Sequence, residues 1–291
     1  MLVAVKQVRS IAEKAADPNR PPLVMGVLNV TPDSFYDGGR YAETDAAIAH
    51  GLEMARQGAD LIDVGGESTR PCALPMDGPA ETARVLPVVE ALVHRSDKAI
   101  SIDTRRAEVA EAALDAGAVV VNDVSGFTYD PAMPGLLGRR KPLAVAMHMR
   151  GTPEDMQSHT RYDSLLNDVA DELWERAQPA LEAGLPLENL FFDPGIGFSK
   201  TWQQNLVLLN NLDSLARLGR PILVGASRKS FIGHVLNNLD PARRLFGTAG
   251  AVAMAVAGGA RILRVHDVAE MRDAILVAHA ISQALPEDEA A

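Results

Sequence analysis

The sequence predicts an α/β fold, a (β/α)8 TIM barrel that forms a single domain after a short N-terminal lead-in. Eight short apolar runs follow one another along the chain, segments of helical period lie between most of them, and polar residues stand directly after the runs. Strand-helix-strand units recur about every 30 residues, and eight in succession favour a closed barrel over the main competitor, a doubly wound sheet. The chain also lacks the GxGxxG that such a sheet often carries after its first strand.

Strands are expected where runs rich in Val, Ile or Leu have the length of strands buried on both faces. They cover residues 23–28, 60–64, 99–102, 118–121, 143–147, 190–192, 222–224 and 261–265. Helical period predicts helices over residues 44–57, 80–94, 106–116, 163–183, 203–218 and 242–257, and a last helix beyond residue 267. Four of these segments are followed by a glycine that can terminate a helix: Gly58, Gly117, Gly184 and Gly219.

The barrel is expected to cover residues 22–284. Residues 1–21 lack strong periodicity, which predicts a lead-in outside the main fold, possibly a short hairpin. Residues 285–291 carry Glu287, Asp288 and Glu289 and are expected to be a solvated acidic tail. No composition break marks a second domain between these ends.

Composition excludes several classes of protein. The chain of 291 residues is 47% hydrophobic and 23% charged, and no apolar run approaches the ~20 residues that span a bilayer. The net charge of -10 argues against nucleic-acid binding, and the single cysteine, Cys72, excludes an internal disulfide and a thiolate-rich metal site. Because the first residues also lack a signal-peptide core, we expect a cytoplasmic protein with small-molecule partners, not nucleic acid or membrane.

Polar residues follow seven of the eight expected strands, at the end where barrels of this kind build their active sites. In chain order they are Asn29, Asp63, Asp103, Asn122, Asp193, Ser227 with Lys229, and Arg264 with His266. Any one of the acids or amides could simply cap the next helix. Together they predict a single polar rim.

The chemistry of this rim suits a flat aminated heterocycle. Carboxylate and amide groups of Asp103, Asn122 and Asp193 can pair with an amidine-like N–H edge through strong, planar hydrogen bonds. Lys229 can donate to a carbonyl or ring nitrogen on the other edge, and the guanidinium of Arg264 can stack on the ring face.

The cations of the rim can also collect an anion, namely Arg70, Arg264 and His266. A carboxylate-rich metal cage is a rival interpretation of the acids, but Asp63, Asp103 and Asp193 stand on strands far apart around the barrel mouth. Since Mg2+ usually takes one or two protein oxygens and keeps substrate phosphates and waters, we expect Mg2+ to bind only with its substrate.

Eight motifs run over nearly the whole chain from residue 22. They are MGVLNVTPDSFYDGG (25–39), IDVGGESTRP (62–71), SIDT (101–104), VND (121–123), MHMRGTP (147–153), DPGIGF (193–198), GASRKSFIG (225–233) and RVHDV (264–268). Together they closely resemble the dihydropteroate synthase family of pterin-binding enzymes. LNVTPDSF and DVGGESTRP are specific to pterin-binding barrels, and SRKSFIG with RVHDV narrows the resemblance to the synthases. The sequence departs from the family pattern at Tyr36, where a small residue is common, and at Ser199, where glycine is common.

The resemblance implies a transferase of folate biosynthesis. Such an enzyme condenses 6-hydroxymethyl-7,8-dihydropterin pyrophosphate with p-aminobenzoate, giving 7,8-dihydropteroate and pyrophosphate. The reaction would begin with an SN1-like loss of pyrophosphate, and the arylamine would then attack the cation left on the pterin. The resemblance also implies Mg2+, a homodimer and inhibition by sulfonamides.

Roles for individual residues follow from the same resemblance. The pterin-binding residues would be Asp103, Asn122, Asp193, Lys229 and Arg264. The pyrophosphate would be surrounded by Asn29, Arg70, Arg264 and His266, with Asn29 touching Mg2+. The p-aminobenzoate pocket would contain Thr69, Phe198 and Ser227. Catalysis would depend on Asp103, Lys229, Arg264 and His266, with Asp63 as a supporting residue and the loops at 31–40 and 66–78 closing over the site.

Two other functions stay open. A pterin-binding paralogue could keep the pocket without condensing the substrates, although the pair Arg264 and His266 and the arylamine-side residues Thr69 and Ser227 argue against it. A methyltetrahydrofolate:corrinoid methyltransferase on a related barrel should lack the SRKS and RVHDV segments that this chain has.

Overall fold

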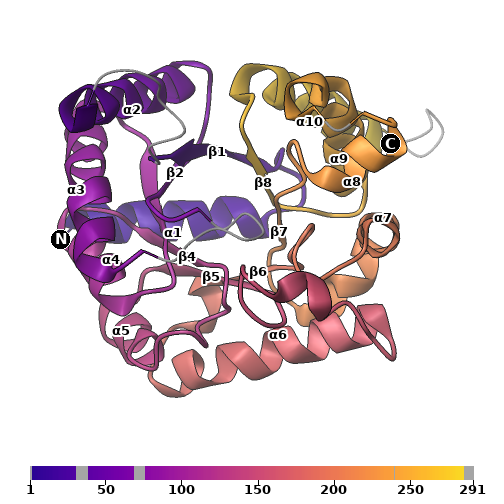
Figure 1. Cartoon of the computed structure of the whole chain (residues 1–291), viewed down its shortest axis with the longest axis horizontal. Helices are drawn as coiled ribbons and strands as arrows, with labels where there is room; N and C mark the ends of the chain where they lie inside the picture. Colours follow the sequence, from indigo (N-terminus) through magenta and orange to yellow (C-terminus); the bar gives the residue numbers. More distant parts are fainter. Residues whose placement is uncertain (1, 31–38, 69–75, 239, 285–291) are drawn as a thin grey trace, which may run out of the picture.

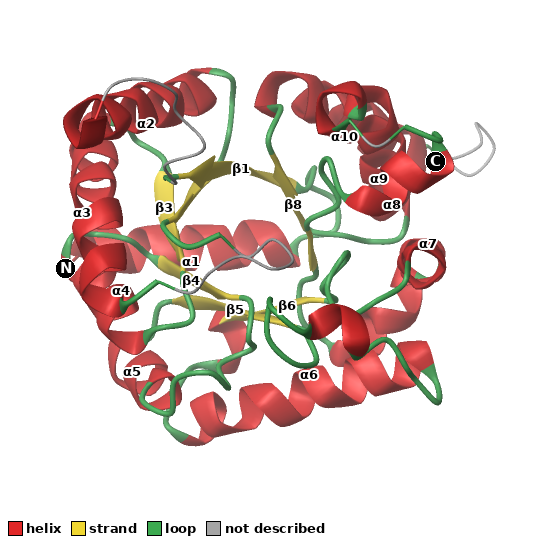
Figure 2. Ribbon diagram, viewed as in Figure 1, coloured by secondary structure: helices red, strands yellow, loops and turns green. Residues whose placement is uncertain are grey.

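Eight parallel strands form a ring in the computed structural model, which describes residues 2–30, 39–68, 76–238 and 240–284 (Figures 1 and 2). The strands are β1 (Leu23–Asn29), β2 (Leu61–Gly65), β3 (Ala99–Asp103), β4 (Val120–Asp123), β5 (Leu143–Met147), β6 (Leu190–Asp193), β7 (Leu223–Val224) and β8 (Ile262–Val265). Their order is β6-β5-β4-β3-β2-β1-β8-β7. A parallel bridge between Phe192 and Ile222, with the Phe192 N–H donating to the Pro221 carbonyl at 3.1 Å, joins the two ends of this order. The predicted (β/α)8 barrel is confirmed.

Helices surround the ring on its outer side (Figure 2). They are α2 (Gly39–Arg56), α3 (Gly78–Arg95), α4 (Ala107–Asp115), α5 (Met133–Arg140), α6 (Leu165–Glu182), α7 (Trp202–Asn210), α8 (Ser230–Val235), α9 (Leu245–Ala257) and α10 (Val268–Ser282). The helix expected over residues 203–218 divides into α7 and a 3-10 helix, Leu212–Leu218. None of the helices within the described ranges has the length and hydropathy of a membrane span.

Side-chain alternation along the strands divides the molecule into an outer and an inner core. On β2, Ile62 and Val64 point outward into the large apolar cluster beneath the helices, whereas Leu61 belongs to a smaller cluster inside the ring. Asp63 and Gly65 share the inward parity of Leu61, because successive side chains of a strand alternate between its faces. The same parity turns the polar ends of other strands inward, including Asp103, Asn122, Asp193 and Arg264. The barrel interior is therefore apolar at one end and polar at the other.

The N-terminal lead-in is a helix, α1 (Leu2–Ala16), so the hairpin expected within residues 1–21 is wrong. Ile11 and Ala15 of α1 are buried in the inner apolar cluster with Leu23 of β1, and Figure 2 shows α1 crossing the ring. Arg261 fixes the end of the helix, since its Nε donates to the Ala15 carbonyl at 3.0 Å. The lead-in thus seals the apolar end of the barrel and belongs to its core.

We expect Ile11→Ala to lower the free energy of unfolding by about 2 to 4 kcal/mol, because it removes buried methyl groups and leaves a cavity in the inner cluster. The measurement is urea denaturation. Val5→Ala is the matched control on the same helix, since Val5 is 63% exposed, and it should change the stability by less than about 0.5 kcal/mol. Equal losses in the two variants would contradict the role given to α1.

Candidate active site

The polar end of the barrel gathers most of the predicted site residues. Asn29, Asp63, Asp103, Asn122, Asp193 and Arg264 lie at or near the carboxyl ends of their strands, and Phe198, Ser227, Lys229 and His266 lie on the connections that follow. Thr69 and Arg70 lie outside the described residues, as do residues 31–38 and 69–75 of the two loops expected to close over the site. The acidic tail, Cys72 and Tyr36 also fall outside them.

Arg264 is the centre of the site. Its Nε donates to Asp63 Oδ2 and its Nη2 donates to Asp103 Oδ2, each at 2.6 Å. Asn122 Nδ2 donates to the same oxygen of Asp63 at 3.0 Å. Burial alone would lower the pKa of Arg264, but Asp63 and Asp103 raise it above its ordinary value. The guanidinium therefore reaches from β8 across the interior to β2 and β3 and stays charged.

Asp103 has an unusual protonation equilibrium for a carboxyl group. Burial raises its pKa to about 7; the positive charge of Arg264 opposes this rise and the negative charge of Asp63 adds to it. Gly65 lies opposite Asp103 in the strand register, and a Cβ at this glycine would come within 3.4 Å of the Asp103 Cβ. A buried carboxyl group that titrates near neutral pH is typical of a functional site.

Lys229 occupies the neighbouring part of the rim. Its Nζ lies 4.1 Å from the centroid of the Phe198 ring, a cation–π distance. Burial, and then the charge of Arg264, lower the pKa of Lys229 to about 8. Asp193 is also buried, which raises its pKa, and its Oδ1 accepts from the Gly195 N–H at 2.7 Å. The lysine and the aromatic ring thus share one wall of the site.

His266 is neutral, and its ring proton is on Nε2, the nitrogen that does not contact Ser227. The Ser227 Oγ accepts from the His266 backbone N–H at 3.2 Å and lies 3.0 Å from His266 Nδ1. Since burial, followed by the charge of Arg264, lowers the pKa of His266 to about 3, the hydroxyl hydrogen can donate to an unprotonated Nδ1. The ring proton is then on Nε2. His266 offers an anion a hydrogen bond and not the positive charge that the sequence suggested.

A buried ion-pair network that the sequence did not reveal joins the two stems of the loop around residues 69–75. Glu67 accepts from Arg105 Nε at 3.0 Å and from Arg106 Nη1 at 3.1 Å, and its other oxygen accepts from the Met76 N–H at 3.0 Å. Arg106 also donates to Glu81 at 2.8 Å. The paired arginines directly after SIDT were the available signal, but they read as an ordinary helix start.

The donor set fits a metal that arrives with its ligand. No group of three or more His, Cys, Asp or Glu side chains within the described ranges is placed to hold a metal ion. Asn29 ends β1 on the inward-facing parity and offers one amide oxygen at the rim. One protein oxygen together with phosphate oxygens is a common environment for Mg2+.

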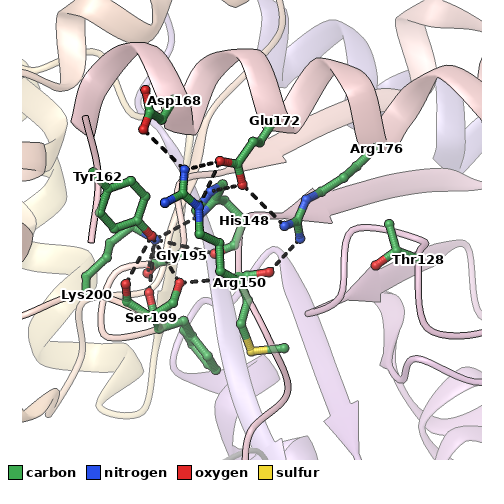
Figure 3. Close-up of polar contacts among 12 residues, drawn as sticks. Thr128, His148, Arg150, Tyr162, Asp168, Glu172, Arg176, Gly195, Ser199 and Lys200 are labelled. Atoms are coloured by element: carbon green, nitrogen blue, oxygen red, sulfur yellow. Dashed lines mark hydrogen bonds and ion pairs between the residues drawn. The ribbon is translucent and has the colours of Figure 1, made fainter. Parts of the chain in front are cut away.

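A second polar cluster lies behind the rim, between β5, α6 and the connection after β6 (Figure 3). It contains the buried residues His148 and Lys200, with Arg150, Glu172 and Arg176 around them. Lys200 is not among the site residues expected from the sequence. Its position two residues after Phe198 was the available signal, because DPGIGF is itself a site motif.

The pairing of Asp63 with Arg264 predicts strong energetic coupling. Each of Asp63→Asn and Arg264→Gln should lower the free energy of unfolding by about 3 kcal/mol, because each leaves a buried partner without its counter-charge. The double variant should lose at least ~1 kcal/mol less than the sum of the single losses. Urea denaturation measures all three. Asp115→Asn is a surface control, since Asp115 is 66% exposed and 2.7 Å from Arg140, and it should cost less than ~1 kcal/mol. Additive losses would contradict the coupling.

The chain is similar to known pterin-binding proteins in sequence and in structure. The family model described as pterin binding enzyme matches residues 25–266. A dihydropteroate synthase of Synechocystis sp. is 46% identical over 258 residues, which cover 89% of this chain and 89% of that protein. The structure of a Xanthomonas albilineans dihydropteroate synthase with 4-aminobenzoic acid has a TM-score of 0.86 at 42% identity and covers 92% of this chain and 95% of that one.

A second structure, of a Xanthomonas albilineans dihydropteroate synthase in complex with 7,8-dihydropteroate, has a TM-score of 0.83 at 40% identity. The match covers 92% of this chain and 96% of that one. The sequence, the fold and the residues of the rim thus all indicate the same family. The chain belongs to the pterin binding enzyme family and, within it, to the dihydropteroate synthases.

Proposed function

We propose that the protein condenses 6-hydroxymethyl-7,8-dihydropterin pyrophosphate with p-aminobenzoate, giving 7,8-dihydropteroate and pyrophosphate. The observation that carries this proposal is the buried array of Asp63, Arg264 and Asp103 beside Lys229 at the polar end of the barrel. This array offers hydrogen-bonding groups to both edges of a heterocycle. It also holds the guanidinium of Arg264 near the position from which the pyrophosphate would leave.

The pterin lies flat over Arg264 in this proposal. The N–H groups of a guanidinium lie in its plane, so the hydrogen bonds of Arg264 to Asp63 and Asp103 are compatible with a ring stacked on its face. Asp103, Asn122 and Asp193 pair with the amino-pyrimidine N–H groups, and Lys229 donates to the opposite edge.

The pyrophosphate group lies against Arg264, His266, Asn29 and Arg70. Arg264 still has N–H groups that neither Asp63 nor Asp103 uses, and His266 donates from Nε2. Mg2+, when bound with the substrate through Asn29, would supply positive charge to balance the charge that develops on the leaving group.

The chemical step breaks the bond between the exocyclic carbon of the pterin and the pyrophosphate oxygen, which keeps the electron pair. The carbon becomes a cation that the electron-rich ring shares, and ionised Asp103 stabilises it electrostatically. The neutral amine of p-aminobenzoate then attacks this carbon and afterwards loses a proton. The amine is nucleophilic without help, so the protein needs no strong general base.

The p-aminobenzoate pocket is proposed to contain Phe198 against the aromatic ring, Ser227 near the carboxylate, and Thr69. Because the Ser227 hydroxyl already contacts His266, this residue connects the arylamine side to the pyrophosphate side. We also propose a homodimer. Exposed apolar side chains on α9 and α10 support it, namely Phe246, Met254, Val277 and Ile281.

A pyrophosphate-release assay with both substrates and Mg2+ tests the proposed function. We expect pyrophosphate to form together with an equal amount of 7,8-dihydropteroate, and sulfonamides, which mimic the arylamine, to compete with p-aminobenzoate. Binding of the pterin substrate without any release would support the binding paralogue instead. Cobalamin-dependent methyl transfer by the purified protein would support the corrinoid methyltransferase.

The pH dependence of kcat/KM for the pterin substrate should be bell-shaped. Activity falls as the pH drops through about 7, because protonation removes the charge of Asp103, and it falls as the pH rises through about 8, because Lys229 loses its proton. The apparent values belong to the coupled array as a whole. The measurement is the initial rate across the pH range.

Two variants distinguish titration of Asp103 and Lys229 from ionisation of the substrates as the origin of the pH profile. Asp103→Asn should abolish the acid limb of the profile, and Lys229→Met should abolish the alkaline limb, while both lower the rate at neutral pH. An acid limb that persists unchanged in Asp103→Asn would assign it to the substrate and contradict the role of Asp103.

A further inference from the structure

We propose that Lys200 is a positioning residue for the arylamine side of the site. Its ammonium group touches no substrate in the proposed complex, but it holds the connection after β6 so that the Phe198 ring faces p-aminobenzoate. This inference rests on the proposed function and extends it to a residue outside the rim.

The Lys200 ammonium is buried and fully engaged. The residue is 3% exposed, and its Nζ lies 2.9 Å from His148 Nδ1, 3.0 Å from the Phe198 carbonyl oxygen and 3.3 Å from the Gly195 carbonyl oxygen. The His148 carbonyl is more distant, at 3.5 Å. An ammonium group has three N–H donors, so these three close acceptors satisfy it. The carbonyl groups of Gly195 and Phe198 therefore both face the end of the Lys200 side chain, and Figure 3 shows Gly195 beside it.

His148 fixes the place of the ammonium from the side of the barrel wall. Burial lowers the pKa of Lys200 to about 7, so the ammonium form is present at and below neutral pH. In that form Nζ can only donate, so His148 Nδ1 accepts and the ring proton is on Nε2. This nitrogen lies 3.1 Å from Glu172 Oε2, to which it donates. Glu172 is held in turn by Arg150 Nε at 2.8 Å and by Arg176 Nη2 at 3.5 Å. Burial, and then Lys200, lower the pKa of His148 to about 3, in agreement with a neutral ring.

The segment from Gly195 to Phe198 has little freedom to take another shape. Gly195 has φ of 69°, and a Cβ there would lie 1.9 Å from the His148 carbonyl oxygen, so glycine is required. Its carbonyl also accepts from the Phe198 N–H at 3.0 Å. Ser199 replaces the glycine common in the family at φ of 45°, and its hydroxyl accepts from the Arg150 N–H at 3.0 Å. Several contacts thus hold the backbone on which Phe198 is mounted.

Phe198 lies between two lysines with different tasks. Lys200 binds its carbonyl oxygen from behind, and Lys229 lies over its ring at the rim. The Asp193 carboxylate is carried by the end of β6 and accepts from the Gly195 N–H, and the charge of Lys200 acts on it without a direct hydrogen bond. Loss of the Lys200 ammonium should therefore disturb the p-aminobenzoate side more than the pterin side. An apolar side chain of similar length would fill the same volume without the cost of burying a charge, so packing alone does not require a lysine here.

The test compares Lys200→Met with wild type in two measurements. One is KM for p-aminobenzoate in the pyrophosphate-release assay, and the other is the Kd for the pterin substrate, titrated without p-aminobenzoate. We expect KM for p-aminobenzoate to rise at least ~10-fold and the pterin Kd to change less than ~3-fold. A general loss of structure would weaken both by similar factors.

Variants of His148 repeat the test without changing Lys200. His148→Gln keeps a donor near Glu172 but offers no acceptor at the Nδ1 position, and it should raise KM for p-aminobenzoate as Lys200→Met does. His148→Asn places an amide oxygen near the Nδ1 position, so its KM for p-aminobenzoate should stay close to that of wild type. Asn189→Ala is the stability control, because Asn189 is buried at the other end of β6 and donates to the Lys141 carbonyl at 2.9 Å. It should lower Tm and leave both measurements unchanged.

The inference is overturned if folded Lys200→Met keeps its KM for p-aminobenzoate within ~3-fold of wild type, or if both substrates weaken equally. A wild-type protein that releases no pyrophosphate would defeat the proposed function and not this inference. In that case, 19F NMR of protein labelled with fluorophenylalanine decides it, with the Phe198 resonance assigned by Phe198→Leu. The Phe198 resonance should move in Lys200→Met, and an unmoved resonance would refute the role of Lys200.

Discussion

The site depends on the guanidinium of Arg264 lying between the carboxylates of Asp63 and Asp103 inside the barrel. Taking such charges out of water costs several kcal/mol for each ion, and only short, well-directed contacts offset that cost. Two carboxylates around one guanidinium leave negative charge in excess. A pocket of this kind suits a ring that is neutral when it binds and becomes positive as it reacts, which describes the pterin ring of a substrate that loses its pyrophosphate group.

Strand alternation creates this arrangement. Every second residue of a barrel strand faces the interior, so a strand with an apolar beginning and a polar end contributes to both halves of the inside. The inner apolar cluster, sealed by α1, fills one half, and the charged array occupies the other. Rigid strands therefore hold Asp63, Asp103 and Arg264, whereas Phe198 is mounted on a connection and needs support from Lys200.

The strands and the polar residues at their ends could be predicted from the sequence, because each is a local pattern of neighbouring residues. Buried strands appear as apolar runs, and their polar ends mark the rim, so the barrel and its inward-facing charges were predictable. The helix α1 was missed although Ala4, Val8 and Ala12 line up with the buried Ile11 and Ala15 at helical spacing. Three of these five residues are alanines, which mark an apolar stripe only weakly. The helix α8 spans 6 residues, too few for a period to appear.

Contacts between distant residues could not be read in the same way. Lys200 and Arg106 look like ordinary surface cations until the fold brings His148 or Glu67 to them. The neutral state of His266 depends on burial and on the nearby charge of Arg264, neither of which a motif displays. The sequence thus indicated which side chains gather at the polar end of the barrel, but not which of them carry charge or what holds them in place.

The most direct measurement is the affinity of Asp63→Asn for the pterin substrate by titration calorimetry. Asp63 is fully buried, and among the described residues its hydrogen bonds come from Arg264 and Asn122. If the array is preorganised by Asp63, its substitution should weaken pterin binding even without a direct contact to the ligand. We expect the Kd to rise at least ~30-fold, about 2 kcal/mol, in a variant that remains folded. An unchanged Kd would show that Arg264 needs no fixed partner, which would contradict the claim that the site depends on Arg264 being held between Asp63 and Asp103.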